Sequence, residues 1–198
     1  MKILHLISSP RGADSVSIQL GNAIVEKLQA AYPDSTVTTR DLTIHPFPYL
    51  EEAHLQSFFT TPEQRTPALE AAVKHSDEAI AQLKTVDIIV IGAPMYNFTI
   101  PSTLKSWIDH IARAGETFSY SEKGPEGLIK GKKVYLAIAE GAIYSEGPMK
   151  AYDFVEPYLR AVLGFMGMTE VIAVRAEGVK IPTVQEKALE KAIASIPV

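Results

Sequence analysis

The chain has 198 residues, of which 46% are hydrophobic and 21% charged, and its formal net charge is −4. This length and composition are typical of a globular protein, and we expect residues 1–198 to form a single domain. The mild negative charge, without any basic block, makes nucleic acid and anionic membranes unexpected partners. The chain contains no cysteine, which excludes disulfides, thiolate metal sites and cysteine nucleophiles.

No segment of the chain predicts a membrane span or a secretion signal. No apolar run approaches the ~20 residues that cross a bilayer, and Ile3–Ile7 is too short for a signal-peptide core. We therefore expect a cytoplasmic protein, and the lack of cysteine fits this weakly. The five histidines have no ligand-like spacing, so we expect no metal site.

The first half of the chain alternates predicted strands and helices. Lys2–Ile7 is typical of a buried strand, and apolar residues at helical spacing predict a helix over Ser17–Ala31. A second strand is predicted over Val37–Leu42, at or near an edge of the sheet. After an irregular stretch with two prolines, helices are predicted over Glu51–Phe59 and Ala68–Leu83.

The second half begins with the most apolar strand. Ile88–Ile91 is continuously apolar and β-branched, as expected for a strand buried on both faces, and it stops at Gly92-Ala93-Pro94. A helix with one apolar face follows Pro101, and its apolar face holds Leu104, Trp107, Ile108 and Ile111. The remaining predicted elements are a short strand over Thr117–Ser121, a strand over Lys133–Ala139, a helix over Tyr152–Met166, a strand over Thr169–Val174 and a helix over Val184–Ala194.

Strands that alternate with helices predict an α/β fold, a doubly wound parallel sheet with helices on both faces. For five strands the common order is 2-1-3-4-5, and its switch point lies between strands 1 and 3. Ligands bind open α/β sheets at the carboxyl end of the strands, near that point. The loop after the first strand and the loop Met95–Phe98 should therefore face each other and form the site.

The loop after the first strand offers hydroxyls from Ser8, Ser9, Ser15 and Ser17 and leads into a helix. The N-terminus of a helix carries partial positive charge and unpaired N–H groups, which suits a phosphate. A plainer interpretation is that Ser15 or Asp14 only caps the helix. Four serines in this loop exceed what one cap needs, which favours phosphate binding.

The second loop places two aromatic residues around one amide. Asn97 has a donor and an acceptor that suit a ring edge with alternating N–H and C=O groups, and Tyr96 and Phe98 can pack on its apolar part. These aromatic residues could instead cover the edge of the sheet. No G-x-G-x-x-G or Walker A motif is present, so a monophosphate with a flat heterocycle fits best, and FMN has both features.

Several distinctive motifs occur in order along nearly the whole chain. They are Ser-Ser-Pro-Arg-Gly at 8–12 with Ser-x-Ser at 15–17, Ala-Pro-Met-Tyr-Asn-Phe-x-Ile-Pro at 93–101, Ala-Arg-Ala-Gly-x-Thr-Phe-x-Tyr at 112–120, Gly-Pro-Glu-Gly-Leu at 124–128 and Leu-Gly-Phe-Met-Gly at 163–167. Together they strongly resemble the bacterial FMN-dependent NADH:quinone oxidoreductases, also called azoreductases. The resemblance implies a flavodoxin-like fold and a homodimer with one FMN per subunit near the subunit interface.

The resemblance also assigns site residues. Ser9, Ser15, Val16 and Ser17 would hold the FMN phosphate. Met95, Tyr96, Asn97 and Phe98 would hold the isoalloxazine, partly through backbone groups. The third flavin loop of the family commonly reads Ser-Arg-Gly-Gly, whereas this chain has Ala139, Glu140, Gly141 and Ala142, which keeps one glycine and reverses the charge at 140.

The implied reaction is a two-electron ping-pong reduction of quinones, and of aromatic azo compounds, with NADH as donor and NADPH as an alternative. The flavin carries the chemistry, so we assign no catalytic acid or base to the protein. Phe118 and Tyr120 fall on one face of a short strand and could line a flat pocket, or pack as a flap on their own subunit. Tyr49 and Leu50 are further pocket candidates.

Two other classes of function fit the same fold. One is a flavodoxin-type electron carrier, although such carriers usually resemble strongly acidic proteins and −4 is mild. The other is a flavin-free α/β interaction module. Flavin absorbance and NADH oxidation distinguish the three.

Overall fold

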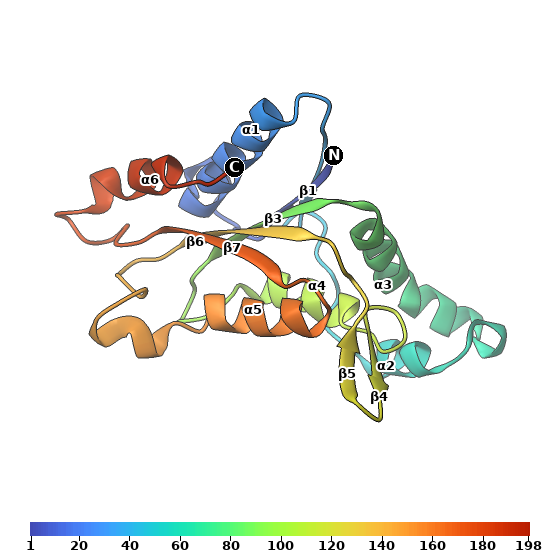
Figure 1. Ribbon diagram of the computed structural model, residues 1–198. Coiled ribbons are helices and arrows are strands. Elements are labelled where there is room, and N and C mark those ends of the chain that lie inside the picture. Colours follow the sequence, from blue (N-terminus) through green and yellow to red (C-terminus); the bar gives the residue numbers. More distant parts are fainter.

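The computed structural model describes residues 1–198, and its centre is a parallel sheet of five strands (Figure 1). Their order across the sheet is β2-β1-β3-β6-β7, and every neighbouring pair is parallel. The five strands are β1 (Lys2–Ile7), β2 (Thr36–Asp41), β3 (Ile88–Pro94), β6 (Lys133–Ala139) and β7 (Glu170–Ala176). The predicted α/β fold with a five-stranded parallel sheet is confirmed.

The strand order differs from the expected 2-1-3-4-5 only in numbering, because two strands of the chain lie outside the parallel sheet. β4 (Phe118–Ser121) and β5 (Gly124–Gly127) pair with each other in an antiparallel hairpin outside it. The fourth and fifth strands of the sheet are therefore β6 and β7. The sequence predicted the first strand of this hairpin but not its partner strand.

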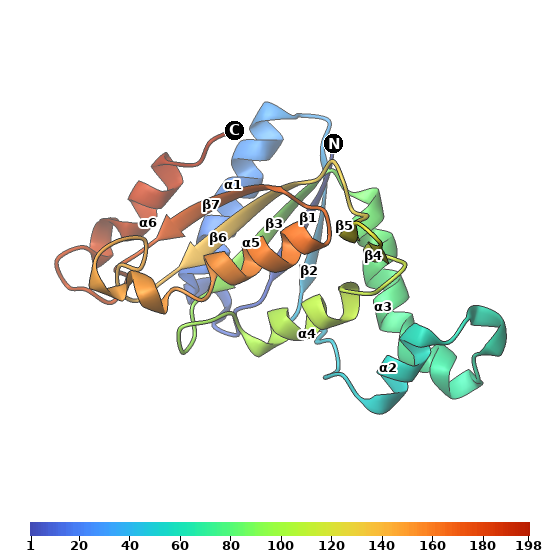
Figure 2. The same cartoon turned by 60° about the horizontal axis from the view of Figure 1, so that its bottom comes forward.

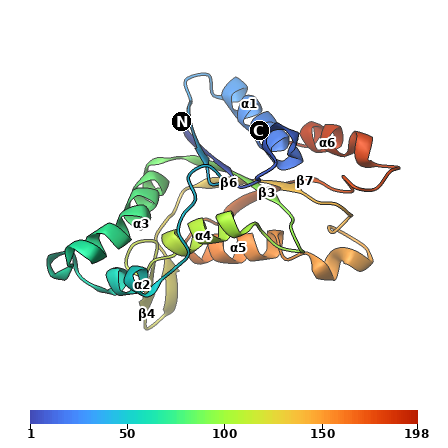
Figure 3. The ribbon, with the colours of Figure 1, turned by 180° about the vertical axis from the view of Figure 1, so that it is seen from behind.

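Helices cover both faces of the sheet, and two hydrophobic cores lie beneath them (Figures 1 and 3). On one face lie α1 (Val16–Ala31) and α6 (Gln185–Ala194), and on the other lie α3 (Pro67–Thr85), α4 (Ser102–Ile111) and α5 (Glu156–Phe165). The short helix α2 (Glu52–Phe59) packs on α3 instead of on the sheet. None of the helices is both long and apolar enough to cross a bilayer.

The two largest errors in the predicted boundaries have local reasons. β3 continues past Ile91 to Pro94, because Gly92–Pro94 stay in register with the end of β6, where the missing N–H of a terminal proline is tolerated. The helix predicted from Tyr152 begins only at Glu156. A carboxylate oxygen of Asp153 accepts from the backbone amides of Val155 and Glu156 and caps α5 there.

Candidate functional site

The loop after β1 is fixed to the neighbouring strand and helix by Ser8. Its hydroxyl donates to the carbonyl of Gly92 in β3 at 2.6 Å, and its own carbonyl accepts from the Thr103 hydroxyl of α4 at 3.1 Å. Because β1 and β3 end at the same edge of the sheet, these bonds hold the serine-rich loop against the start of α4 (Figure 2).

The serines predicted to bind phosphate are buried around the N-terminus of α1. The hydroxyls of Ser15 and Ser17 lie 3.0 Å apart, and both residues are at most 2% exposed. Ser15 occupies the N-cap position, but its side chain makes no capping hydrogen bond. The plainer interpretation of Ser15 as a simple cap is therefore wrong. The amides of Val16 and Ser17, the first two residues of α1, donate to nothing within the chain, so this donor-rich end suits an anion such as phosphate.

The Met95–Phe98 loop is a tight turn with a strained backbone. Tyr96 and Thr99 exchange two backbone hydrogen bonds of 2.9 and 3.1 Å, and the two residues between them, Asn97 and Phe98, have φ of 50° and 71°. Turns with two positive φ values favour glycine and asparagine, so phenylalanine there is unusual. The amides of Asn97 and Phe98 donate to nothing within the chain, and the Asn97 side chain is exposed and unpaired.

The two loops meet, as the sequence predicts. The hydroxyls of Ser9 and Tyr96 lie 3.2 Å apart, which joins the loop after β1 to the turn after β3 at the switch point of the sheet. Met95 also donates through its amide to the carbonyl of Ala139 at 2.9 Å. The three segments expected to form one site thus lie side by side.

The loop after β6 is held by the segment that follows β7. The carbonyls of Glu140, Gly141 and Ala142 accept from backbone amides of residues 178–180, at 3.0 to 3.1 Å. The amides of Gly141 and Ala142 have no partner within the chain. This loop therefore presents free backbone donors beside the Met95–Phe98 turn.

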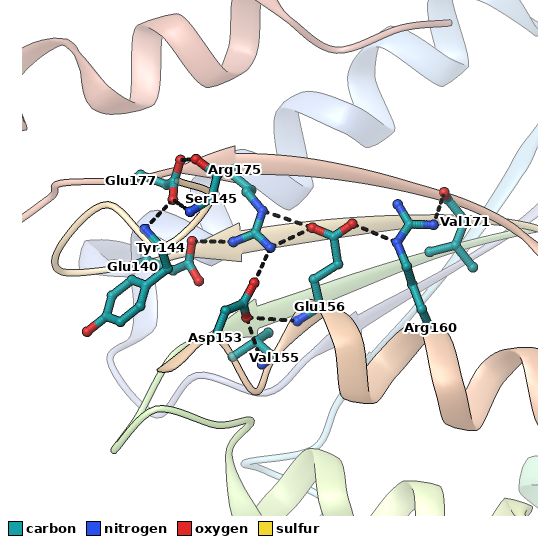
Figure 4. Close-up of polar contacts among 10 residues, drawn as sticks. All are labelled: Glu140, Tyr144, Ser145, Asp153, Val155, Glu156, Arg160, Val171, Arg175 and Glu177. Carbon is teal, nitrogen blue, oxygen red and sulfur yellow. Dashed lines mark hydrogen bonds and ion pairs between the residues drawn. The ribbon is translucent and has the colours of Figure 1, made fainter. Parts of the chain in front are cut away.

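A cluster of charged side chains lies under this loop (Figure 4). Arg175, in β7, donates to Glu140 at 2.7 Å, to Asp153 before α5, and to Glu156 in the first turn of α5. We call these four residues the Arg175 cluster. Glu140 is fully buried and its second carboxylate oxygen has no partner. Burial raises the pKa of Glu140 to about 7, although Arg175 pulls that pKa downward.

The predicted pocket residues lie elsewhere in the chain. Phe118 packs on Phe165 with ring centroids 4.4 Å apart and touches the exposed ring of Tyr120. Their hairpin follows the C-terminal end of α4, whereas the Met95–Phe98 turn precedes its N-terminal end (Figure 2). Tyr49 and Leu50 are also exposed on a separate segment. Within one chain these four residues do not reach the three site loops.

Two cavities of the chain lie outside the three loops, although the second adjoins the loop after β6 and has Ile143 and Arg175 in its lining. One of about 550 Å³ lies between α2, α3 and Arg113, and one of about 490 Å³ lies between α6 and the end of β7. The first is lined by ion-paired side chains, among them Arg113 with Asp77. The Arg113 of the Ala-Arg-Ala-Gly motif is thus a buried structural cation. In one chain the candidate site is an open edge and not an enclosed pocket.

The sequence did not reveal several residues that shape the site. Tyr152 packs on the ring of Phe98 with centroids 5.5 Å apart, and Phe154 donates through its amide to the carbonyl of Phe98 at 3.2 Å. Arg175 was missed as well. The one available signal for Arg175 was that a charged residue interrupts the apolar pattern of the last strand. Nothing in the sequence identified the side chains that pair with it.

The fold and the three loops at its switch point define a flavodoxin-like protein. The model of the Flavodoxin_2 family, described as a flavodoxin-like fold, matches residues 1–197.

Individual relatives place the chain more closely. An FMN-dependent NADH:quinone oxidoreductase of Herminiimonas arsenicoxydans is 49% identical over 178 residues, covering 90% of this chain and 87% of that protein. The crystal structure of an azoreductase from Bacillus anthracis has a TM-score of 0.93 at 32% identity, covering 99% and 96%. An FMN-dependent NADH-azoreductase from the same species, in complex with FMN, has a TM-score of 0.86 at 28% identity, covering 98% and 97%. The chain belongs to this family of FMN-dependent NADH:quinone oxidoreductases and azoreductases.

Proposed function

We propose that this protein is an FMN-dependent NADH:quinone oxidoreductase that also cleaves aromatic azo compounds reductively. The observation that carries the proposal is the contact between Ser9 and Tyr96, which joins an anion-ready helix N-terminus to an aromatic turn. That pairing suits a ligand with a phosphate at one end and a flat ring at the other. The names of the relatives supply the reaction class.

The phosphate of FMN would lie at the N-terminus of α1. The hydroxyls of Ser15 and Ser17, 3.0 Å apart, and the amides of Val16 and Ser17 would donate to it, together with the buried hydroxyl of Ser9. The partial positive charge of a helix N-terminus, together with hydroxyl donors, can stabilise a phosphate dianion even where no arginine or lysine pairs with it.

The isoalloxazine would lie between the Met95–Phe98 turn and the loop Ala139–Ala142. The free amides of Asn97, Phe98, Gly141 and Ala142 can donate to ring acceptors, and the side chains of Met95 and Tyr96 supply apolar contact. Recognition through backbone amides tolerates the change from arginine to Glu140, because the side chain at 140 turns away to Arg175.

When bound, FMN would supply the redox chemistry, carrying two electrons per cycle from NADH, or from NADPH as an alternative donor, to a quinone; cleavage of an azo bond would need two such cycles. The residues of this chain bind and orient the ring and keep one face open for donor and acceptor in turn. We assign no proton transfer to a protein side chain.

We further propose a homodimer with one FMN per chain, in which the hairpin of one subunit covers the flavin of the other. Phe118, Tyr120, Tyr49 and Leu50 lie far from the loops of their own chain, and Tyr49 and Tyr120 are 73% and 72% exposed. Exposed aromatic side chains on a projecting hairpin suit a protein interface. A second copy would turn the open edge into an enclosed aromatic slot.

The test is FMN titration of the purified protein, followed by NADH oxidation with a benzoquinone or an azo dye as acceptor. We expect one FMN per chain and acceptor-dependent oxidation. A protein that binds FMN without oxidising NADH would be an electron carrier. A protein that binds no FMN would be an interaction module.

A further inference from the structure

The Arg175 cluster is connected to the Met95–Phe98 turn by a short path of hydrogen bonds. Asp153 receives Arg175 on one carboxylate oxygen and caps the first amides of α5 with the other. The capped backbone places the amide of Phe154, which donates to the carbonyl of Phe98 at 3.2 Å. A largely buried cation is thus linked, in three steps, to Phe98, the second central residue of the turn.

The turn needs such support because its backbone is strained. Asn97 and Phe98 both lie in the left-handed region, where a residue with a bulky side chain loses roughly 1 kcal/mol or more. The two bonds between Tyr96 and Thr99 close the turn, and the Phe154 amide provides the backbone hydrogen bond that reaches its second central residue from outside. Without that contact the turn can relax to a conformation that displaces its free amides.

We propose that Arg175 is a positioning residue for FMN, which holds the Phe154 amide on Phe98 and thereby keeps the Met95–Phe98 turn ready for the isoalloxazine. This proposal rests on the proposed function, because it concerns the binding of FMN. Arg175 does not touch the ring; it acts through Asp153 and the backbone. Its planar guanidinium serves three carboxyl groups at once, a geometry that lysine cannot reproduce.

Glu140 makes this support depend on pH. The charged groups around its buried carboxyl come from three segments: Arg175 in β7, Asp153 and Glu156 at the start of α5, and Glu177 and Lys180 after β7. In the cluster, the one positive charge of Arg175 faces three carboxyl groups. If Glu140 is ionised in addition to Asp153 and Glu156, the third negative charge is poorly compensated. Because the pKa of Glu140 lies at about 7, its ionisation above neutral pH should loosen the cluster and weaken FMN binding.

The first experiment compares Arg175→Met with Arg160→Met. Arg160 shares the partner Glu156, at 2.6 Å, but has no bond to Glu140 or Asp153, so it is a matched control. We expect Arg175→Met to weaken FMN about tenfold or more and Arg160→Met to change it by less than about twofold. In the FMN-free protein, amide hydrogen exchange of Phe154 should be faster in Arg175→Met only.

The second experiment uses Glu140→Gln, which keeps the shape and an oxygen for Arg175 but cannot ionise. At about pH 6 it should bind FMN within about twofold of the wild type, and at about pH 8.5 about fivefold more tightly. This comparison decides the role of Glu140 even where Arg175→Met does not fold. It needs no turnover measurement.

The outcomes separate the two proposals. Wild-type protein that binds no FMN would overturn the proposed function. Wild-type protein that binds FMN, with Arg175→Met indistinguishable from Arg160→Met in affinity and in Phe154 exchange, would overturn the positioning role while the function stands. Parallel pH profiles for the wild type and Glu140→Gln would overturn the role of Glu140.

Discussion

At the scale of single residues, Asn97 offers two groups that could bind a flavin, its side-chain amide and its backbone amide, and a substitution can distinguish them. Its side chain is exposed and unpaired, whereas its backbone adopts φ of 50° and presents a free amide. Either group can recognise a flavin edge. The sequence pointed to the side chain, and the structure adds the backbone as a second donor.

Replacing Asn97 by glycine removes the amide side chain and keeps the left-handed backbone at no steric cost. We expect Asn97→Gly to weaken FMN by about 1–3 kcal/mol, because a paired hydrogen-bonding edge is lost. Asn97→Ala should weaken FMN further, by roughly 1 kcal/mol of backbone strain. FMN affinity unchanged in Asn97→Gly, measured by fluorescence titration, would assign the recognition to the backbone alone.

His5 is a second residue with a measurable consequence. It lies in β1, is 3% exposed, and its Nε2 atom has no partner. A Cβ atom at Gly21 of α1 would come within 2.6 Å of that nitrogen, so helix and strand are packed closely around the ring. Burial lowers the pKa of His5 from 6.5 to about 4.

This lowered pKa sets the sign of an acid effect on stability. Between pH 6.5 and about 4 the unfolded chain binds a proton at His5 that the folded chain does not, so stability falls as the pH falls. The loss attributable to His5 is about 3 kcal/mol over that window. Urea unfolding of His5→Leu should show a flatter pH dependence than the wild type. The exposed His45→Gln is the control, and equal slopes in all three proteins would contradict the account.

At the scale of elements, the β4–β5 hairpin depends on a contact between two glycines. A Cβ atom at Gly127 of β5 would lie 2.1 Å from the amide nitrogen of Gly167, just after α5. The amide of Ile129 donates to the carbonyl of Met166 beside it, at 2.9 Å. The motifs Gly-Pro-Glu-Gly-Leu and Leu-Gly-Phe-Met-Gly, which are far apart in the sequence, thus pack against each other through Gly127 and Gly167.

A methyl group at Gly127 cannot be accommodated without moving backbone. We expect Gly127→Ala to destabilise the fold by about 1–3 kcal/mol and to free the hairpin from α5. Thermal unfolding and hydrogen exchange of β4 measure the two effects. Gly124→Ala is the matched control for the contact, because a Cβ there meets no atom within 4 Å, although its φ of +100° adds backbone strain. Hairpin exchange equal in the two variants would contradict the packing argument.

At the scale of the whole molecule, the sequence correctly predicted those elements whose buried residues form a continuous run or follow a helical spacing. The residues of β3 are all buried, and Leu104 and Ile108 of α4 face the core, as their spacing predicted. That the loop after β1 faces the Met95–Phe98 turn also followed from the order of strands. The departure of the hairpin from the sheet and the Arg175 cluster did not, because both depend on contacts between segments far apart in the sequence.

The proposed dimer predicts complementation between two defective chains. A Ser9→Ala/Ser17→Ala chain should lose FMN retention, and a Phe118→Ala/Tyr120→Ala chain should lose substrate reduction. If the hairpin covers the site of the other subunit, a mixed dimer has one intact site and regains about half the wild-type activity per dimer. If the hairpin serves its own chain, mixing restores nothing. Sedimentation of the wild type as a monomer would contradict the dimer directly.

The measurement that tests the central claim most directly is steady-state NADH oxidation by the FMN-loaded protein, with benzoquinone varied at several NADH concentrations. We predict oxidation that requires both FMN and quinone, with the parallel double-reciprocal lines of a ping-pong reaction. A purified protein that retains FMN stoichiometrically but oxidises no NADH in the presence of benzoquinone would contradict the assignment.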